Sequence, residues 1–131
     1  MKNGSPKPKS SPPNSDRGRL GRRGEDLAVA FLAVQGFEIV DRNWCCRVGE
    51  IDLVVRHGQD YRFVEVKTRR THAYGYPESS VTAKKLRHLA GTMELWLRAH
   101  GCTPKTYQVD VLAISILSGQ TEPQIEWIQG V

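Results

Sequence analysis

The residue types best suited to chemistry are concentrated between Glu50 and Lys67, where acids and a lysine recur on two apolar segments. A two-residue turn at Gly58-Gln59 would join these segments as a β-hairpin, with glycine at the position that needs a positive φ. In that register Asp52 lies opposite Glu65, and Glu50 lies opposite Lys67. Because side chains alternate along a strand, all four share one face of the hairpin.

Two carboxylates that face each other across a strand pair repel, so Asp52 and Glu65 require a positive charge between them. Lys67 is one source of that charge. A hard divalent cation held by carboxylate and backbone oxygens is another. The alternative is a structural network in which Glu50 bridges to Lys67 and Asp52 binds backbone. That network accounts for Glu50 and Lys67, but not for an acid placed opposite Asp52.

The other face of the hairpin is almost wholly apolar and should lie on a core. Its residues are Ile51, Leu53 and Val55 opposite Arg62, Val64 and Val66. The charged face also carries Val54, Tyr61 and Phe63, so it is not an ordinary solvated surface.

The hairpin needs supporting elements, and periodicity predicts them on both sides of it. A helix is expected over residues 19–35, with Leu20, Leu27, Phe31 and Val34 as its apolar stripe and Gly36 as its C-cap. A short strand follows at 37–44. A second helix is expected over 79–100, with Lys84, Lys85, Arg87 and Arg98 away from its apolar stripe and Gly101 at its end.

Strands are expected again at 106–116, which carries the single carboxylate Asp110, and at 125–128. The order helix, three strands, helix, two strands predicts an α/β fold in which helices flank a mixed sheet. The second helix would form a right-handed crossover between the hairpin and the later strand.

Positive charge favours a polyanionic partner, because the chain has a net charge of +5 and a pI of about 9.3. Arginines gather at the start of the first helix and directly after Lys67. We expect Arg19, Arg22, Arg23, Arg69 and Arg70 to contact nucleic-acid phosphates. The alternative is a solvated basic surface. In the loop 68–77, Tyr74 and Tyr76 could stack on bases or pin the loop to the core.

Composition is that of one soluble domain: 131 residues, 39% of them apolar and 25% charged. We expect residues 1–17 to form a disordered basic tail and residues 18–131 a single domain. The chain has no apolar run of membrane-spanning length and no secretory signal, which favours a cytoplasmic protein. The odd count of three cysteines indicates reduced core thiols rather than disulfides, and a Cys/His metal site is less favoured.

Four segments resemble a known family when taken in order: Gly24-Glu25-Asp26-Leu27-Ala28, Gly49-Glu50-Ile51-Asp52-Leu53-Val54, Phe63-Val64-Glu65-Val66-Lys67-Thr68-Arg69 and Val109-Asp110-Val111. They are similar to the PD-(D/E)xK nuclease superfamily and, within it, to the small bacterial YraN family, which is related to archaeal Holliday-junction resolvases. One departure is Ile51, which stands where many superfamily members have proline. Proline does no chemistry, so the departure says little against metal binding.

The resemblance implies a restriction-endonuclease-like α-β-β-β-α-β(-β) core that hydrolyses phosphodiester bonds of DNA with Mg²⁺ or Mn²⁺. It implies Asp52 and Glu65 as metal ligands, with the Val66 carbonyl as a candidate third oxygen. Lys67 would stabilise charge or help activate water. Glu25 matches an additional acidic residue of the resolvases. From the residues alone, Glu25 is either an acid at the edge of the core or a surface carboxylate paired with Arg22.

Three functions therefore compete at this stage. The first is a metal-dependent DNA endonuclease, with branched, single-stranded or otherwise structured DNA as candidate substrates. The second is a non-catalytic nucleic-acid-binding module of the same fold, and the third is a scaffold that binds a protein partner. A homodimer would supply two sites for two strands.

Overall fold

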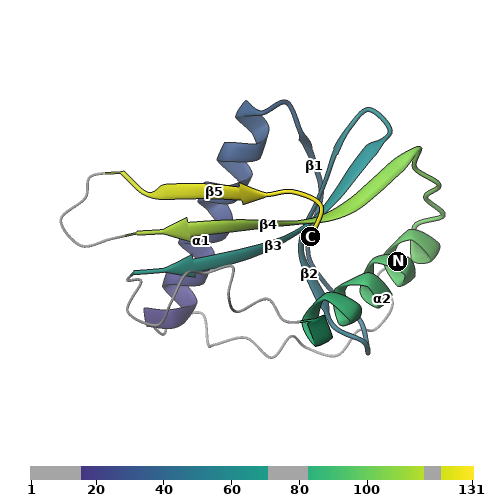
Figure 1. The fold of residues 1–131 in the computed structure, drawn as a ribbon, viewed down its shortest axis with the longest axis horizontal. Coiled ribbons are helices and arrows are strands. Elements are labelled where there is room, and N and C mark those ends of the chain that lie inside the picture. Colours follow the sequence, from purple (N-terminus) through teal and green to yellow (C-terminus); the bar gives the residue numbers. More distant parts are fainter. Residues whose placement is uncertain (1–15, 71–82, 117–121) are drawn as a thin grey trace.

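The computed structural model describes residues 16–70, 83–116 and 122–131. Its elements are α1 (Asp16–Val34), β1 (Glu38–Cys45), β2 (Glu50–His57), β3 (Asp60–Arg69), α2 (Ala83–Ala99), β4 (Thr106–Ser115) and β5 (Gln124–Ile128). The predicted order of helices and strands is therefore confirmed (Figure 1). Residues 1–15 and the predicted start of the second helix lie outside the described residues.

The strands form one five-stranded mixed sheet in the order β1-β2-β3-β4-β5. Neighbouring strands are antiparallel except β3 and β4, which are parallel. Parallel neighbours need a long connection, and α2 lies between them in the chain. The predicted α/β class with a mixed sheet is thus confirmed.

The β2–β3 hairpin has the predicted register. His57 faces Asp60 and Leu53 faces Val64, and Gly58 adopts a positive φ of 61° in the turn. The backbone pairing between the two strands ends at Leu53–Val64. Toward its start, β2 continues to pair with β1 as far as Glu50, so β3 loses its neighbour on that side.

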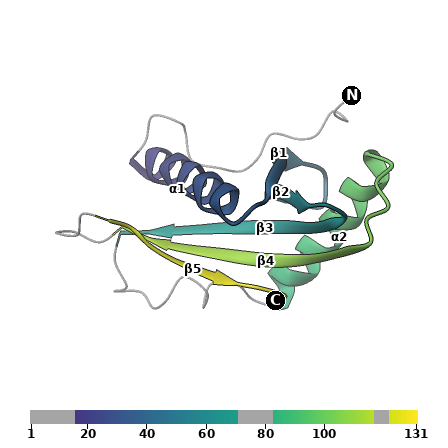
Figure 2. The ribbon, with the colours of Figure 1, turned by 90° about the horizontal axis from the view of Figure 1, so that it is seen from above.

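The sheet separates two apolar clusters. On one face, α1 contributes Ala28 and Leu32, which pack with Leu53, Val55, Val64, Leu112 and Ile114. On the other, α2 contributes Leu89, Met93, Trp96 and Leu97, which pack with Val54, Tyr61, Phe63 and Val109. Figure 1 shows α1 crossing behind β3, β4 and β5, and Figure 2 shows that it lies on one side of the sheet. Both faces of the hairpin are therefore covered, which explains why its charged side also carries apolar residues.

The predicted stripe of α1 is partly wrong, because Val34 is 84% exposed whereas Ala28 and Leu32 are fully buried. The helix approaches β3 through small residues: a Cβ at Gly24 would overlap the side chain of Thr68. Close contact through Gly24 and Ala28 rotates the buried stripe away from Val34. The helix ends where predicted, since Gly36 has a φ of 94° and Phe37 N donates to Leu32 O at 3.0 Å.

Ile51 also departs from prediction, because it packs in the α2-side cluster rather than with Leu53 and Val55. Here β2 pairs only with β1, where Ile51 faces Trp44, a member of the same cluster. Without β3 beside it, this end of β2 does not follow the pleat of the hairpin. The register of β1 against β2 also shifts between Ile39 and Asp41, a bulge that simple alternation did not predict.

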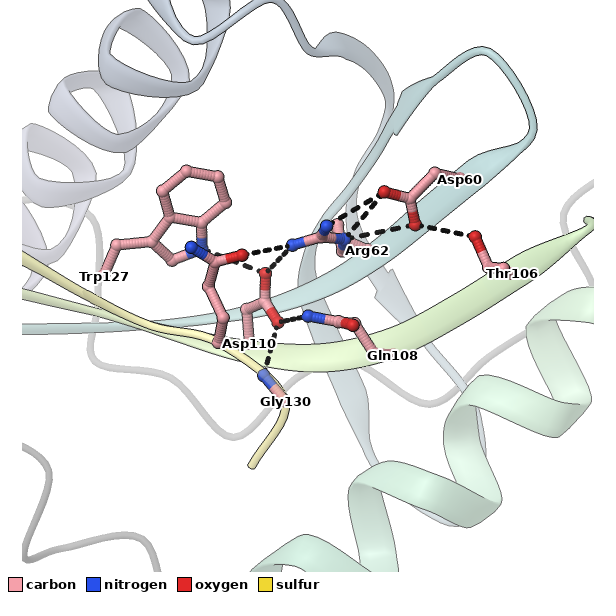
Figure 3. Close-up of polar contacts among 8 residues, drawn as sticks. Asp60, Arg62, Thr106, Gln108, Asp110, Trp127 and Gly130 are labelled. Carbon is pink, nitrogen blue, oxygen red and sulfur yellow. Dashed lines mark hydrogen bonds and ion pairs between the residues drawn. The ribbon is translucent and has the colours of Figure 1, made fainter.

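A closed polar network joins β3, β4 and the C-terminal residues (Figure 3). Its centre is Asp110, which is fully buried. The carboxylate accepts four hydrogen bonds of 2.7–3.0 Å, from Arg62 Nη1, Gln108 Nε2, Trp127 Nε1 and Gly130 N. Each of its oxygens receives two donors, so this buried acid has a complete set of partners.

The three cysteines are free thiols, as predicted. Cys45 is buried, and Cys46 and Cys102 pack against the α2-side cluster. Within the described ranges, no helix combines the length and the apolar character needed to cross a membrane.

Candidate functional site

A cleft of about 620 Å³ opens where the pairing of β2 with β3 stops. Its walls come from the first half of α1, the start of β2, the end of β3 and the first half of α2. Four of its lining residues are acids, namely Glu25, Glu50, Asp52 and Glu65, and two are the lysines Lys67 and Lys85. The structure therefore brings the predicted quartet of Glu25, Asp52, Glu65 and Lys67 to one cavity.

Asp52 occupies the position at which the β2–β3 ladder ends. Its Oδ2 accepts a hydrogen bond from Val66 N at 2.8 Å, so the side chain satisfies a strand amide that has lost its β2 neighbour. Glu65 is 7% exposed. Its Oε1 forms ion pairs with Lys67 Nζ at 3.4 Å and with Lys85 Nζ at 3.0 Å. Within the described part of the chain, Asp52 Oδ1 and Glu65 Oε2 have no hydrogen-bond partner.

The electrostatics of the cleft disfavour charge on Asp52. Burial raises the pKa of Asp52 well above its ordinary value, and the charge of Glu65 raises it further, whereas the Val66 hydrogen bond lowers it. Burial and Glu65 also raise the pKa of Glu50. Burial and the contact with Lys85 lower the pKa of Lys67. The site thus concentrates like charges in a poorly solvated place, an arrangement that is common at functional sites.

Glu25 reaches the cleft from α1 and does not pair with Arg22. Its Oε1 accepts a hydrogen bond from Asn43 Nδ2 at 3.0 Å and lies 3.7 Å from Arg42 Nη2. Its charge contributes to the raised pKa of both Asp52 and Glu50. The alternative of a surface carboxylate bridged to Arg22 is therefore wrong, and Glu25 belongs to the electrostatic environment of the site.

The structural-network alternative is correct in one part and wrong in another. Asp52 does bind backbone, as that alternative supposed. Lys67, however, pairs with Glu65, while Glu50 accepts a weak hydrogen bond from the Cys45 thiol at 3.8 Å. Asp52 and Glu65 are near enough for the charge of Glu65 to raise the pKa of Asp52, although the backbone pairing that would set them opposite each other has already ended at Leu53–Val64. Two lysines contact Glu65.

A divalent cation places requirements on the number and type of its ligands. Residues 16–70, 83–116 and 122–131 hold no group of three or more His, Cys, Asp or Glu side chains placed to bind a metal. Mg²⁺ keeps several waters and uses one or two carboxylates. Asp52 Oδ1 and Glu65 Oε2 fit that requirement, and the Val66 carbonyl as a third ligand stays a prediction.

The predicted phosphate-binding arginines lie around the cleft rather than in it. Arg19, Arg22 and Arg23 are exposed on α1, where Leu20 and Gly21 of the same turns line the cleft. Arg69 ends β3 and Arg70 follows it, exposed. Their contact with phosphates stays a prediction, and the loop residues Tyr74 and Tyr76 lie outside the described residues.

Lys85 was not predicted as a site residue, because the lysines of α2 were assigned away from its apolar stripe. The helical repeat contains a signal that could have placed it correctly. Lys85, Leu89 and Thr92 stand at i, i+4 and i+7, and the last two are buried. Lys85 therefore lies on the same helix face as the two buried residues, one turn earlier, at the edge of the core. Lys85, Leu89 and Thr92 all line the cleft.

The model of an uncharacterised protein family, UPF0102, matches residues 24–114. The chain belongs to the UPF0102 family. This confirms the resemblance to YraN-like proteins, and the matched residues run from the Gly24 contact with β3 to the end of β4.

Members of UPF0102 from distant bacteria are similar over most of the chain. A Geobacter sulfurreducens protein is 48% identical over 109 residues, which cover 83% of this chain and 84% of the relative. An Arthrobacter protein is 44% identical over 112 residues, covering 86% and 94%. A Streptomyces griseus protein is 40% identical over 116 residues, covering 88% and 97%. Their names state the family and no reaction.

Proposed function

We propose that this UPF0102 protein is a metal-dependent phosphodiesterase that acts on DNA, with branched or single-stranded DNA as the favoured substrates. The observation that carries the proposal is the pair Asp52 and Glu65. Both line one cleft, and each keeps one carboxylate oxygen without a partner in the described residues. Such a pair offers two hard oxygen ligands beside two lysines, which suits a cation together with a phosphate.

The chain's own residues would divide the work as follows. Asp52 and Glu65 would hold a Mg²⁺ or Mn²⁺ ion. When bound, the ion would lower the pKa of a water ligand and offset the negative charge of the phosphate. Lys67 is fixed on β3 beside Glu65 and would stabilise the negative charge that develops on the phosphate oxygens. At about 4 Å and an effective dielectric of 20, one charge pair is worth about 4 kcal/mol. If realised only in the transition state, this corresponds to roughly three decades of rate.

A second candidate, a nucleic-acid-binding module that does not cut, is favoured by one specific observation. The described site already compensates itself, because Glu65 Oε1 receives two lysines and Asp52 accepts the Val66 amide. Such a site could retain the geometry of an ancestral enzyme without binding a cation. Metal binding and cleavage therefore have to be measured separately.

The experiment compares matched variants on branched, single-stranded and duplex DNA with Mg²⁺, Mn²⁺ or EDTA. We expect Asp52→Asn and Lys67→Met to reduce the cleavage rate by about a thousandfold. Asp26→Asn and Lys84→Met are matched controls, since both side chains are exposed and neither lines the cleft.

Three outcomes separate the candidate functions. If the wild type cleaves DNA and neither Asp52→Asn nor Lys67→Met lowers the cleavage rate, the assignment of the site is refuted. A salt-sensitive gel shift without cleavage would identify the binding module. The absence of any DNA or RNA shift at low salt would favour the protein scaffold.

A further inference from the structure

Two lysines from different elements of the cleft contact a single carboxylate oxygen. Lys67 comes from β3, two residues after Glu65, and its side chain is 25% exposed. Lys85 comes from the first turn of α2, and its side chain is 35% exposed. Lys85 Nζ is the nearer of the two to Glu65 Oε1, at 3.0 Å against 3.4 Å. Two ammonium groups thus share one carboxylate oxygen, and the other acids of the cleft, Glu25, Glu50 and Asp52, add negative charge around them.

A cation on Glu65 would change this balance. Its charge would repel both ammonium groups, and the two lysines differ in their freedom to respond. Lys67 is held in a strand that pairs with β4, and it is the more buried of the two. Lys85 projects from the first turn of α2 and is the more solvent-accessible of the two. Lys85 is therefore the lysine that can leave Glu65 for a group on the open side of the cleft.

We propose that Lys85 is an exchangeable cation of the site, paired with Glu65 when the cleft holds no metal and with a substrate phosphate oxygen when a divalent cation occupies Glu65. The inference rests on the proposed function, since it assumes a cation at Asp52 and Glu65. It assigns Lys85 a role in binding the phosphodiester substrate, and it makes metal binding and substrate binding mutually dependent. A merely structural salt bridge would lack that dependence.

The first test measures Mn²⁺ affinity by electron paramagnetic resonance, without DNA. Lys85→Met removes a positive charge that opposes the cation, so Mn²⁺ should bind roughly tenfold more tightly, the effect of one charge on a divalent ion at about 6 Å in a water-like dielectric. Lys85→Arg should restore the wild-type affinity. Lys84→Met, its exposed neighbour in sequence, should leave the affinity unchanged. A salt bridge that only supports the fold predicts the opposite sign, with weaker Mn²⁺ binding in Lys85→Met.

The second test measures binding to a cleavage-resistant phosphorothioate oligonucleotide over a range of salt concentrations, with Mn²⁺ and with EDTA. With Mn²⁺, Lys85→Met should lower the slope of log K against log salt by about one phosphate contact. With EDTA it should leave the slope unchanged, because Lys85 is then paired with Glu65. Lys84→Met should have the same effect in both conditions.

Failure of this inference can be told apart from failure of the proposed function. If wild-type protein binds Mn²⁺ and Asp52→Asn abolishes that binding, the metal site stands. Unchanged or weaker Mn²⁺ binding in Lys85→Met would then overturn the role of Lys85 alone. The same conclusion would follow if Lys85→Met changed the salt slope by the same amount with Mn²⁺ and with EDTA. If the wild type binds no Mn²⁺ at all, the proposed function and this inference fail together.

Discussion

The same substitution at two buried or partly buried aspartates should have opposite effects on stability. Asp110 has four donors on its two oxygens. Asparagine keeps one acceptor oxygen and presents an NH₂ group to the donors on the other side, so two hydrogen bonds are lost. Each buried group left unsatisfied costs about 1–3 kcal/mol. Arg62 also loses a buried counter-charge, although Asp60 still contacts it at 2.9 Å. We expect Asp110→Asn to cost about 3–5 kcal/mol.

Asp52 differs because the structure gives it one hydrogen bond, from Val66 N, and acidic neighbours. Asparagine keeps an oxygen for Val66 N and removes the charge that faces Glu65. The backbone pairing ends one residue earlier, at Leu53–Val64, but the two like charges remain neighbours, and we take their repulsion to be comparable with that of a cross-strand pair, roughly 0.2–1 kcal/mol. We therefore expect Asp52→Asn to be neutral or to stabilise the fold by up to about 1 kcal/mol at pH 7.

Urea unfolding at pH 7 with EDTA measures both variants against the wild type. A shift in midpoint with an unchanged slope reports stability alone. The stabilities of the two variants should differ by at least about 3 kcal/mol, with Asp52→Asn equal to or above wild type and Asp110→Asn far below it. A difference under about 1 kcal/mol would refute the reasoning, because it would mean that the number of donors around each carboxylate does not decide its contribution.

Further predictions concern pH, metal and packing. The folded state keeps the Asp52 proton at pH values where the unfolded chain has lost it, since the pKa of Asp52 is raised in the fold. The advantage of Asp52→Asn should therefore vanish near pH 4 and grow as pH rises, which urea titrations at several pH values would check. Mn²⁺ at a hundred times its Kd should stabilise the wild type by about 2.7 kcal/mol and leave Asp52→Asn unaffected in thermal melts. Gly24→Ala should cost about 1–3 kcal/mol because its Cβ overlaps Thr68. Gly21→Ala, where a Cβ meets nothing within 4 Å, should stabilise the helix by up to about 1 kcal/mol.

Much of the fold follows from local sequence signals. The register of the hairpin came from one glycine in a two-residue turn, and the helix ends from Gly36 and Gly101. Once the register was set, alternation placed Asp52, Glu65 and Lys67 on one side, and the cleft contains all three. These features depend on neighbours a few residues apart, which is the range over which sequence patterns are informative.

The errors arise where distant elements meet. Val34 belongs to an apolar pattern but lies in the last turn of α1, whose close contact with β3 is made through Gly24 and Ala28. Ile51 follows the alternation of the hairpin but packs with Trp44, because β3 no longer pairs with β2 there. Lys85 appeared to be a solvent-facing lysine until the sheet placed Glu65 beside it. In each case the decisive neighbour is remote in sequence.

The end of the β2–β3 ladder ties the fold to its candidate chemistry. A continuous ladder would satisfy Val66 N with a β2 carbonyl and would leave no space beside Glu65. Because the pairing stops at Leu53–Val64, the Asp52 side chain takes over Val66 N, and both helices close around the gap to form the cleft. The acid that repairs the strand is thus the acid whose other oxygen we propose as a ligand for the cation. Asp110, in an uninterrupted strand with all its hydrogen bonds made, has no oxygen left to offer.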